Sequence, residues 1–326
     1  MLTSLAIRRF KSIKSLELPC RKVNVFIGPP DTGKTNILEA LGFLSRLAWG
    51  LPLDESLRLS RELGFEPLFH RQLLDQPFEI EVTATESGAS GVLAARIMGP
   101  HRQLSLTREA WHTLVRYGQG VSLSALQWLR QYAYLSSEAW RYESGNDVLV
   151  VTPPHGQNLH YVARHHERVY DFLRDQVASS GWKLRFDQAA KTFRMSEVRD
   201  DDIIDYNLDL LSDSLKRFFF YGAILLTSEN ATLVLDEPDV FAFPPYPKTL
   251  GEMIGHDTSN QFFVTTHNPY FLAGVLAKTK AADLALFVCH RDEAGDTAVR
   301  LLDVEQVADV IEHGASVFFN LDAFVD

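Results

Sequence analysis

Residues 28–36 read GPPDTGKTN, and this short stretch decides the fold. Its first eight residues satisfy the pattern GxxxxGK[ST]. The apolar run VNVFI precedes it at residues 23–27, and apolar residues recur at helical spacing over residues 36–49. A strand, a glycine loop and a helix in this order are the context in which the pattern forms a phosphate-binding loop.

The chemistry expected of this loop follows from its backbone. Successive N–H groups at the start of a helix form a concave nest, where the helix dipole favours an anion. Pro29 and Pro30 have no N–H, so we expect the nest over residues 31–35, with Asp31 in the left-handed backbone conformation. Lys34 is expected to reach the β- and γ-phosphates of a nucleotide, and the Thr35 hydroxyl to ligate Mg²⁺. The predicted nucleotide contacts in the loop are Gly28, Asp31, Thr32, Gly33, Lys34, Thr35 and Asn36.

A second acidic motif, LVLDEP, occupies residues 233–238. An apolar strand would deliver Asp236 and Glu237 to the carboxyl edge of a sheet, where successive side chains alternate in direction. We therefore expect Asp236 to hold Mg²⁺ and Glu237 to act as the base that faces an attacking water. A strand end with two solvated acids is the alternative interpretation.

His267 follows another apolar strand, within VTTHNP at residues 264–269. A lone histidine is more often structural than catalytic. Here a strand next to the acidic one would place the imidazole at the same sheet edge, so we predict a catalytic role beside the γ-phosphate.

The spacing of the motifs predicts how the chain is organised. Lys34 and Asp236 are 202 positions apart, whereas ring-forming AAA+ ATPases typically separate these motifs by several tens of residues. We expect a core of about residues 1–60 and 205–326, with a second lobe of about 61–204 inserted between. Within the insertion we predict strands in FEIEVTAT, GVLAARIMG and VLVV, a helical segment from Arg102 to Asn146, a helix over 161–177 and a hairpin over 182–198.

Several stretches together resemble a known group of proteins. These are NVFIGPPDTGKTNILEAL, PPHGQNL, LSDSLKRFFFYGAIL, LDEPDVFAFPPY and NQFFVTTHNPYFL. In this order they resemble the ABC-type ATPase heads of the RecF, SMC and OLD group, and more closely a prokaryotic AAA-type, RecF-like branch. The resemblance implies an α/β P-loop NTPase fold, an ABC-type head with a mixed β-sheet core and a helical and β insertion before the signature helix.

The resemblance also implies a site completed by a second subunit. Ser212, Asp213 and Ser214 stand where ABC-type heads carry their signature, so they would cap a helix that faces the γ-phosphate of the partner. Many such heads have glycine where this chain has Ser214, and an ordinary capped helix is the alternative. Gln72 is a weak candidate for the glutamine that links the metal to the helical lobe. We expect neither a nuclease domain nor long coiled-coil arms in this chain.

The function implied is Mg²⁺-dependent binding and hydrolysis of ATP through an ATP-induced homodimer. The resemblance suggests coupling to DNA repair or to defence against foreign DNA. The alternative is a nucleotide-switched binding module with slow turnover, which regulates a separate effector protein such as a nuclease or toxin, or binds DNA.

Composition limits these roles further. A formal net charge of −10 argues against wrapping nucleic acid over the whole surface, although residues 155–199 hold eight Lys or Arg against five Asp or Glu. No apolar run approaches the roughly 18 residues that a membrane span requires. Charges within the first 15 residues disfavour a secretory signal, so we expect a cytoplasmic protein in which Cys20 and Cys289 are reduced.

Overall fold

A mixed six-stranded sheet forms the centre of the molecule. The structure is a computed structural model that describes residues 1–51, 66–86, 89–98, 103–108, 111–115, 126–135, 147–179, 181–189, 192–199 and 202–325. The central sheet has the order β15-β14-β3-β13-β12-β8, in which only β15 is antiparallel to its neighbour. Its strands are β3 (Val23–Ile27), β8 (Leu129–Tyr132), β12 (Thr232–Leu235), β13 (Gln261–Thr265), β14 (Leu284–Arg291) and β15 (Thr297–Leu301). Strands from both ends of the chain therefore share one sheet.

Both faces of this sheet are covered, which explains why β3, β12, β13 and β14 are largely apolar. Every residue of β3, β12 and β13 is buried. Val25 and Phe26 are neighbours in β3, yet they belong to two different core clusters, because successive side chains point to opposite faces. Each face thus has its own hydrophobic core.

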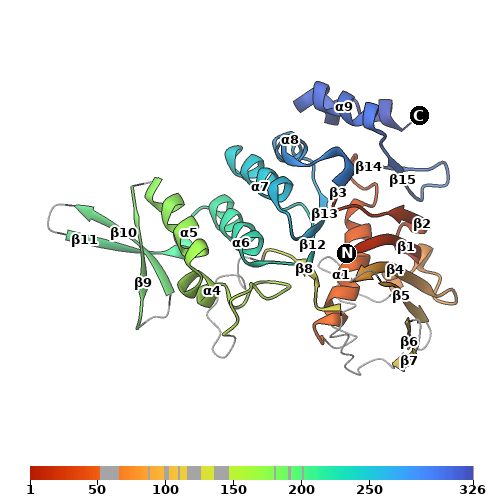
Figure 1. Ribbon diagram of the computed structural model, residues 1–326, viewed down its shortest axis with the longest axis horizontal. Helices are drawn as coiled ribbons and strands as arrows, with labels where there is room; N and C mark the ends of the chain where they lie inside the picture. Colours follow the sequence, from red (N-terminus) through yellow and green to blue (C-terminus); the bar gives the residue numbers. More distant parts are fainter. Residues whose placement is uncertain are drawn as a thin grey trace.

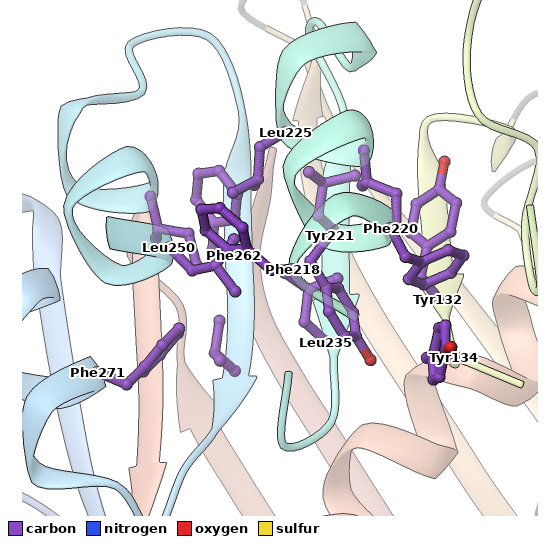
Figure 2. Packing of buried hydrophobic residues seen from close by; sticks show 14 of the residues in the cluster. Tyr132, Tyr134, Phe218, Phe220, Tyr221, Leu225, Leu235, Leu250, Phe262 and Phe271 are labelled. Carbon is purple, nitrogen blue, oxygen red and sulfur yellow. The ribbon is translucent and has the colours of Figure 1, made fainter. Parts of the chain in front are cut away.

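Helices α6 (Asp213–Thr227), α7 (Pro245–His256) and α8 (Pro269–Lys278) contribute to one core. Figure 2 shows Phe218 and Tyr221 of α6 beside Leu235 and Phe262 of the sheet, with Leu250 of α7 alongside. Burial of a large side chain of this kind contributes roughly 1.5–3 kcal/mol, so this face is a main source of stability.

The opposite core lies between the central sheet and an antiparallel sheet, with α1 (Lys34–Ala48) in between. The antiparallel sheet has the order β2-β1-β4-β5-β6-β7. Its strands are β1 (Leu2–Phe10), β2 (Ile13–Pro19), β4 (Phe78–Glu86), β5 (Ala89–Met98), β6 (Gln103–Arg108) and β7 (Trp111–Val115). In Figure 1 this sheet lies beside α1, close to the N-terminus.

The predicted helical segment from Arg102 to Asn146 is wrong where the structure describes it. Three strands, β6, β7 and β8, lie there, while residues 116–125 and 136–146 are outside the described residues. The reason is visible in β6, where Leu104 and Leu106 are buried and alternate with polar residues, a period of two that fits the edge of β5. The aromatic-rich composition of the segment obscured that alternation.

An outer lobe stands away from the central sheet in Figure 1. It contains α4 (Leu159–His165), α5 (Glu167–Ser179) and a three-stranded sheet of order β11-β10-β9. The strands are β9 (Lys183–Asp187), β10 (Thr192–Arg199) and β11 (Asp202–Asn207). The predicted hairpin is present, but β11 was missed because it is almost wholly exposed and carries no apolar alternation.

Two further predictions in this region are corrected. The single helix over 161–177 is two helices, because His166 adopts extended backbone between α4 and α5. The predicted strand at 148–151 is a loop. Asn158 holds this loop by donating to the carbonyls of Val148 and Val150, both at 2.8 Å.

The inserted segment is joined to the core through strand pairing. β4 pairs with β1, and β8 pairs with β12 of the central sheet. The division into a core of about 1–60 and 205–326 and a lobe of about 61–204 stays a prediction. These pairings make the outer lobe, and not the whole insertion, the part that projects.

The remaining elements are α9 (Val304–His313) and short 3₁₀ segments. The latter are η1 (Glu66–Leu68), η2 (His70–Gln72), η4 (Leu208–Leu210), η5 (Ala281–Asp283), η6 (Gly314–Phe319) and η7 (Leu321–Phe324). None of the helices in the described part of the chain has the length and apolar character to span a membrane. Cys20 and Cys289 are both free thiols, and burial raises the pKa of each to about 12.

Candidate functional site

The loop of residues 28–33 connects β3 to α1 in a conformation that needs glycine at two places. A Cβ on Gly28 would lie 2.3 Å from the carbonyl oxygen of Cys289, and one on Gly33 would lie 2.1 Å from Oγ1 of Thr297. Asp31 has a φ of 59°, the left-handed conformation predicted for it. The loop is therefore fitted closely against β14 and β15.

Lys34 closes the loop on itself. Its side chain is buried, and Nζ donates to the carbonyl oxygens of Pro29 at 2.7 Å and Gly28 at 3.0 Å. Burial lowers the pKa of Lys34, while the nearby Glu237 and Asp236 carboxylates oppose that change. The hydroxyl of Thr32 donates to the same Pro29 carbonyl at 2.9 Å. The ammonium group is thus held inside the loop where a phosphate is expected.

Asp236 lies where the ends of three parallel strands meet. Thr265, at the end of β13, donates to Oδ1 of Asp236 at 2.6 Å, and Thr35 at the start of α1 donates to the same oxygen at 3.3 Å. β3, β13 and β12 are neighbours, so their carboxyl ends reach one edge of the sheet. The structure therefore brings together Thr35 and Asp236, which are 201 positions apart. Hydroxyl and carboxylate oxygens of this kind are ligands that Mg²⁺ prefers.

Glu237 and His267 face each other at this edge. Oε1 of Glu237 lies 3.5 Å from Nε2 of His267, and Glu237 has an unusual φ of 44°. The backbone N–H of Glu237 donates to Oγ1 of Thr265 at 2.9 Å. Burial lowers the pKa of His267, and the Lys34 charge lowers it further, although Asp236 opposes this. The lowered pKa favours the neutral imidazole, whose Nε2 lies close to the Glu237 carboxylate.

Sequence reasoning missed Thr265, Thr266 and Asp239. Thr265 joins the two acids, as described above. Thr266 donates to Oδ2 of Asp239 at 2.7 Å, and burial raises the pKa of Asp239 to about 7. The two threonines directly before His267 were the available signal, because side chains at a parallel strand end share that edge.

Asn36 takes part in a polar cluster on the other side of the loop. Its amide donates to Oγ of Ser12 at 2.6 Å, and Ser12 is hydrogen bonded to Thr297 at 2.7 Å. This cluster ties α1 to the β1–β2 turn and to β15, directly beside Gly33. Gln72 lies exposed in η2 with a φ of 58°, and its proposed role stays a prediction.

The predicted cap of α6 is present. Oγ of Ser212 accepts a hydrogen bond from the backbone N–H of Leu215 at 3.3 Å. Oδ2 of Asp213, in the first turn, lies 3.6 Å from Nε of Arg217. Oγ of Ser214 accepts from the backbone N–H of Phe243 at 2.7 Å, which links the start of α6 to the loop that follows the two acids.

That loop borders an open hollow of about 350 Å³. Glu237, Asp239 and His267 line it from the site, and Phe241 and Tyr270 line it from outside. Phe241, Phe243 and Tyr270 are 80%, 59% and 50% exposed, respectively. These three exposed aromatic residues form an apolar surface at the rim of the site, beside half-buried Glu237 and buried Asp239.

Comparison with known proteins supports this architecture. The family model described as "AAA domain, putative AbiEii toxin, Type IV TA system" matches residues 128–273, which contain Asp236, Glu237 and His267. An SMC head bound to the C-winged helix domain of ScpA is similar with a TM-score of 0.61 and 14% identity, over 94% of this chain and 99% of that chain. An SMC head domain with an extended coiled coil, bound to the C-terminal domain of ScpA derived from Pyrococcus furiosus, is similar with a TM-score of 0.58 and 13% identity. The match covers 96% of this chain and 98% of that chain. No curated protein matches this chain.

The predicted fold class is confirmed by the mixed sheet together with these matches. The predicted resemblance to ABC-type heads is confirmed at the level of an SMC-like P-loop ATPase fold. Assignment to a branch without a nuclease domain stays a prediction.

Proposed function

We propose that this chain, which has the fold of an ABC-type, SMC-like P-loop ATPase head, binds ATP with Mg²⁺ and hydrolyses it. One observation carries the proposal. Lys34, Thr35, Asp236 and Glu237 come from distant parts of the sequence and meet at one sheet edge, with Thr35 and Asp236 sharing a hydrogen bond. A solvated strand end would not need this convergence.

Each residue has a role that its contacts support. Lys34 would exchange the carbonyls of its own loop for the β- and γ-phosphates, and Thr35 and Asp236 would hold Mg²⁺. The ion, when bound, neutralises charge on the phosphates. Glu237 would accept a proton from the attacking water. Neutral His267 would keep the Glu237 carboxylate oriented. Thr265 fixes both acids, because it donates to one and accepts from the backbone of the other.

The proposal includes a second copy of the chain that closes over the nucleotide. The start of α6 contacts the loop that carries Phe241 and Phe243, through Ser214. Unpaired N–H groups at a helix start attract phosphate, and exposed aromatic residues favour burial at an interface. Phe241 lines the hollow beside Glu237 and His267, and there the partner subunit would complete the site with its own Ser212, Asp213 and Ser214.

The biological setting we propose is DNA repair or defence against foreign DNA, in the cytoplasm. The alternative is a nucleotide-switched binding module that controls a separate nuclease or toxin, with slow turnover. The matched family is described as containing a putative toxin, which supports this alternative. The two similar SMC heads are bound to domains of ScpA, so protein partners are known for this fold.

ATP hydrolysis by the purified chain tests the enzyme, with Glu237→Gln as the decisive variant. We expect turnover to fall by about 10² to 10⁴, as for loss of a positioned base, while ATP affinity is kept. Glu229→Gln, an exposed acid just before β12, is the matched control. Equal hydrolysis by the wild-type chain and Glu237→Gln would remove Glu237 from this role, and very slow turnover in both would favour the binding module.

Light scattering of the Glu237→Gln protein tests the second copy. ATP should double the mass because binding energy favours the dimer, and ADP should do so much less. Ser212→Arg should abolish the change by placing bulk at the contact. A mass that stays monomeric under all conditions would reject the closed dimer, and a dimer independent of nucleotide would indicate a permanent scaffold.

A further inference from the structure

Helix α9 carries an apolar stripe that is exposed on the surface. Val304 is 71% exposed and Ile311 is 56% exposed, and exposed Ala308 lies between them. Residues four and seven apart fall on one side of a helix. On its other side α9 is anchored by buried Val310. The exposed stripe is therefore separate from the face that attaches the helix to the protein.

The segment that follows adds another apolar group. Phe319, in η6, is 90% exposed and is the most exposed large apolar side chain in the described residues. η6 packs against both α8 and α9, so this segment is held in place and does not extend freely. Figure 1 shows α9 at the rim of the molecule, near the C-terminus of the chain.

The same region is strongly acidic. Residues 301–325 contain five acidic residues and neither Lys nor Arg. Glu305, Asp309 and Glu312 are exposed on α9, and at about 100° per residue Glu305 and Glu312 lie together along one side of the apolar stripe. The surface thus has an apolar strip with an acidic border.

We propose that this α9 face, defined by Val304, Ala308, Ile311, Glu305 and Glu312, binds a basic amphipathic helix of a partner protein. An apolar stripe at helical spacing fits the apolar face of a second helix, as in helix-in-groove recognition. Lys or Arg beside that face would pair with the acidic border. The proposal goes beyond ATP hydrolysis and does not depend on it.

The acidic border of the α9 face argues against two other partners, a second copy of the chain and an anionic lipid surface. The same region of a second copy offers no Lys or Arg to pair with the acidic border, and in an antiparallel pair the two borders would lie together, where like charges are unfavourable. An anionic lipid surface would be repelled in the same way, because surface-binding helices carry Lys and Arg beside their apolar face. A basic helix is the occupant that satisfies both the apolar stripe and its border.

The position of α9 leaves the nucleotide site free. β15 runs antiparallel to β14, so it leads the chain away from the edge that carries Gly28 before α9 begins. A partner on α9 would not have to displace a second head at the site.

Fluorescence anisotropy with a labelled synthetic peptide tests the proposal on the whole chain. The probe is a helix of about five turns with leucine on one face and lysine elsewhere, and a scrambled peptide of equal composition is its control. We expect Ile311→Ser, and separately Val304→Ser, to weaken binding by about tenfold. The double variant Glu305→Lys with Glu312→Lys should weaken it by at least as much and should reduce the dependence on salt.

Matched controls lie on β11, which Figure 1 places at the opposite end of the molecule. Ile203 is 57% exposed and Asp202 is exposed beside it, so Ile203→Ser and Asp202→Lys repeat the same chemical changes elsewhere. These variants should bind the peptide as the wild-type chain does. The proposal is overturned if the peptide does not bind, if the scrambled peptide binds equally well, or if the α9 variants match the β11 variants. A nucleotide-free dimer that Ile311→Ser dissolves would also overturn it, since the occupant would then be a second copy.

Discussion

The edge of the central sheet and the outer lobe are built in different ways. At the edge, β3, β12 and β13 are wholly buried, and three separate segments are joined by hydrogen bonds among Thr35, Asp236, Glu237 and Thr265. In the outer lobe, β11 is exposed along almost its whole length, and ion pairs such as Arg194 with Asp187 remain partly in solvent. The same substitution should therefore have a large effect in the first region and a small one in the second.

The largest expected effect is the loss of nucleotide binding in Lys34→Ala. Two charge-assisted hydrogen bonds to phosphate contribute about 3 kcal/mol together, so ATP affinity should fall by about 10²-fold. Lys183→Ala, an exposed lysine on β9, is the control and should leave affinity unchanged. Calorimetric titration with ATP and Mg²⁺ measures both. Equal affinities in two folded variants would mean that the loop is not the phosphate site.

A smaller effect on stability is expected from alanine at two glycines. Gly33 and Gly181 have similar left-handed φ values of 95° and 82°. A Cβ at Gly33 would clash with Thr297, whose hydroxyl is held by Ser12, whereas nothing lies within 4 Å of a Cβ at Gly181. We expect Gly181→Ala to lower the free energy of unfolding by about 1 kcal/mol from backbone strain alone, and Gly33→Ala by about 2 kcal/mol or more.

Urea denaturation of the two alanine variants separates strain from packing. The backbone penalty is common to both, so the difference between them measures the fit of the loop against β15. If both variants lose the same stability, the loop is not closely packed and the contrast between the two regions fails at this point.

The two regions also differ in how much their sequences predicted. β3, β12 and β13 were predicted because strands buried on both faces are mostly apolar runs, and here each run ends in a polar motif. β6 and β11 were not, because a half-exposed strand depends on its neighbours, and those pairings are not visible in composition. The strands that carry the site, β3, β12 and β13, are therefore among those that the sequence predicted.

Within the site, motif residues were predicted and their supports were not. Lys34, Asp236 and Glu237 belong to recognisable local patterns, so their convergence could be expected. Thr265 and Ser12 act only because β13 lies beside β12 and because the β1–β2 turn reaches α1. Such contacts are set by register between distant segments, which a single sequence does not specify.

Asp239 gives the last and smallest expected effect, a change in how stability depends on pH. Burial raises the pKa of this carboxyl to about 7, well above its ordinary value. Between roughly pH 4 and 7 the folded chain keeps a proton that the unfolded chain releases, so the free energy of unfolding falls as pH rises through this window. Above about pH 7 the buried group ionises and the penalty is fully present.

Asp239→Asn removes that penalty while its amide oxygen can still accept from Thr266. Without nucleotide or Mg²⁺, the variant should exceed the wild-type chain in stability, by at least about 1 kcal/mol more at about pH 8 than at about pH 5, since each pKa unit corresponds to about 1.4 kcal/mol. Asp205→Asn, an exposed acid on β11, should show no such pH-dependent gain. Urea midpoints at the two pH values decide between these outcomes. Parallel pH profiles of stability for Asp239→Asn and the wild-type chain would mean that water reaches Asp239 as freely as it reaches the outer lobe. The edge of the central sheet would then be more open to solvent than its hydrogen bonds indicate.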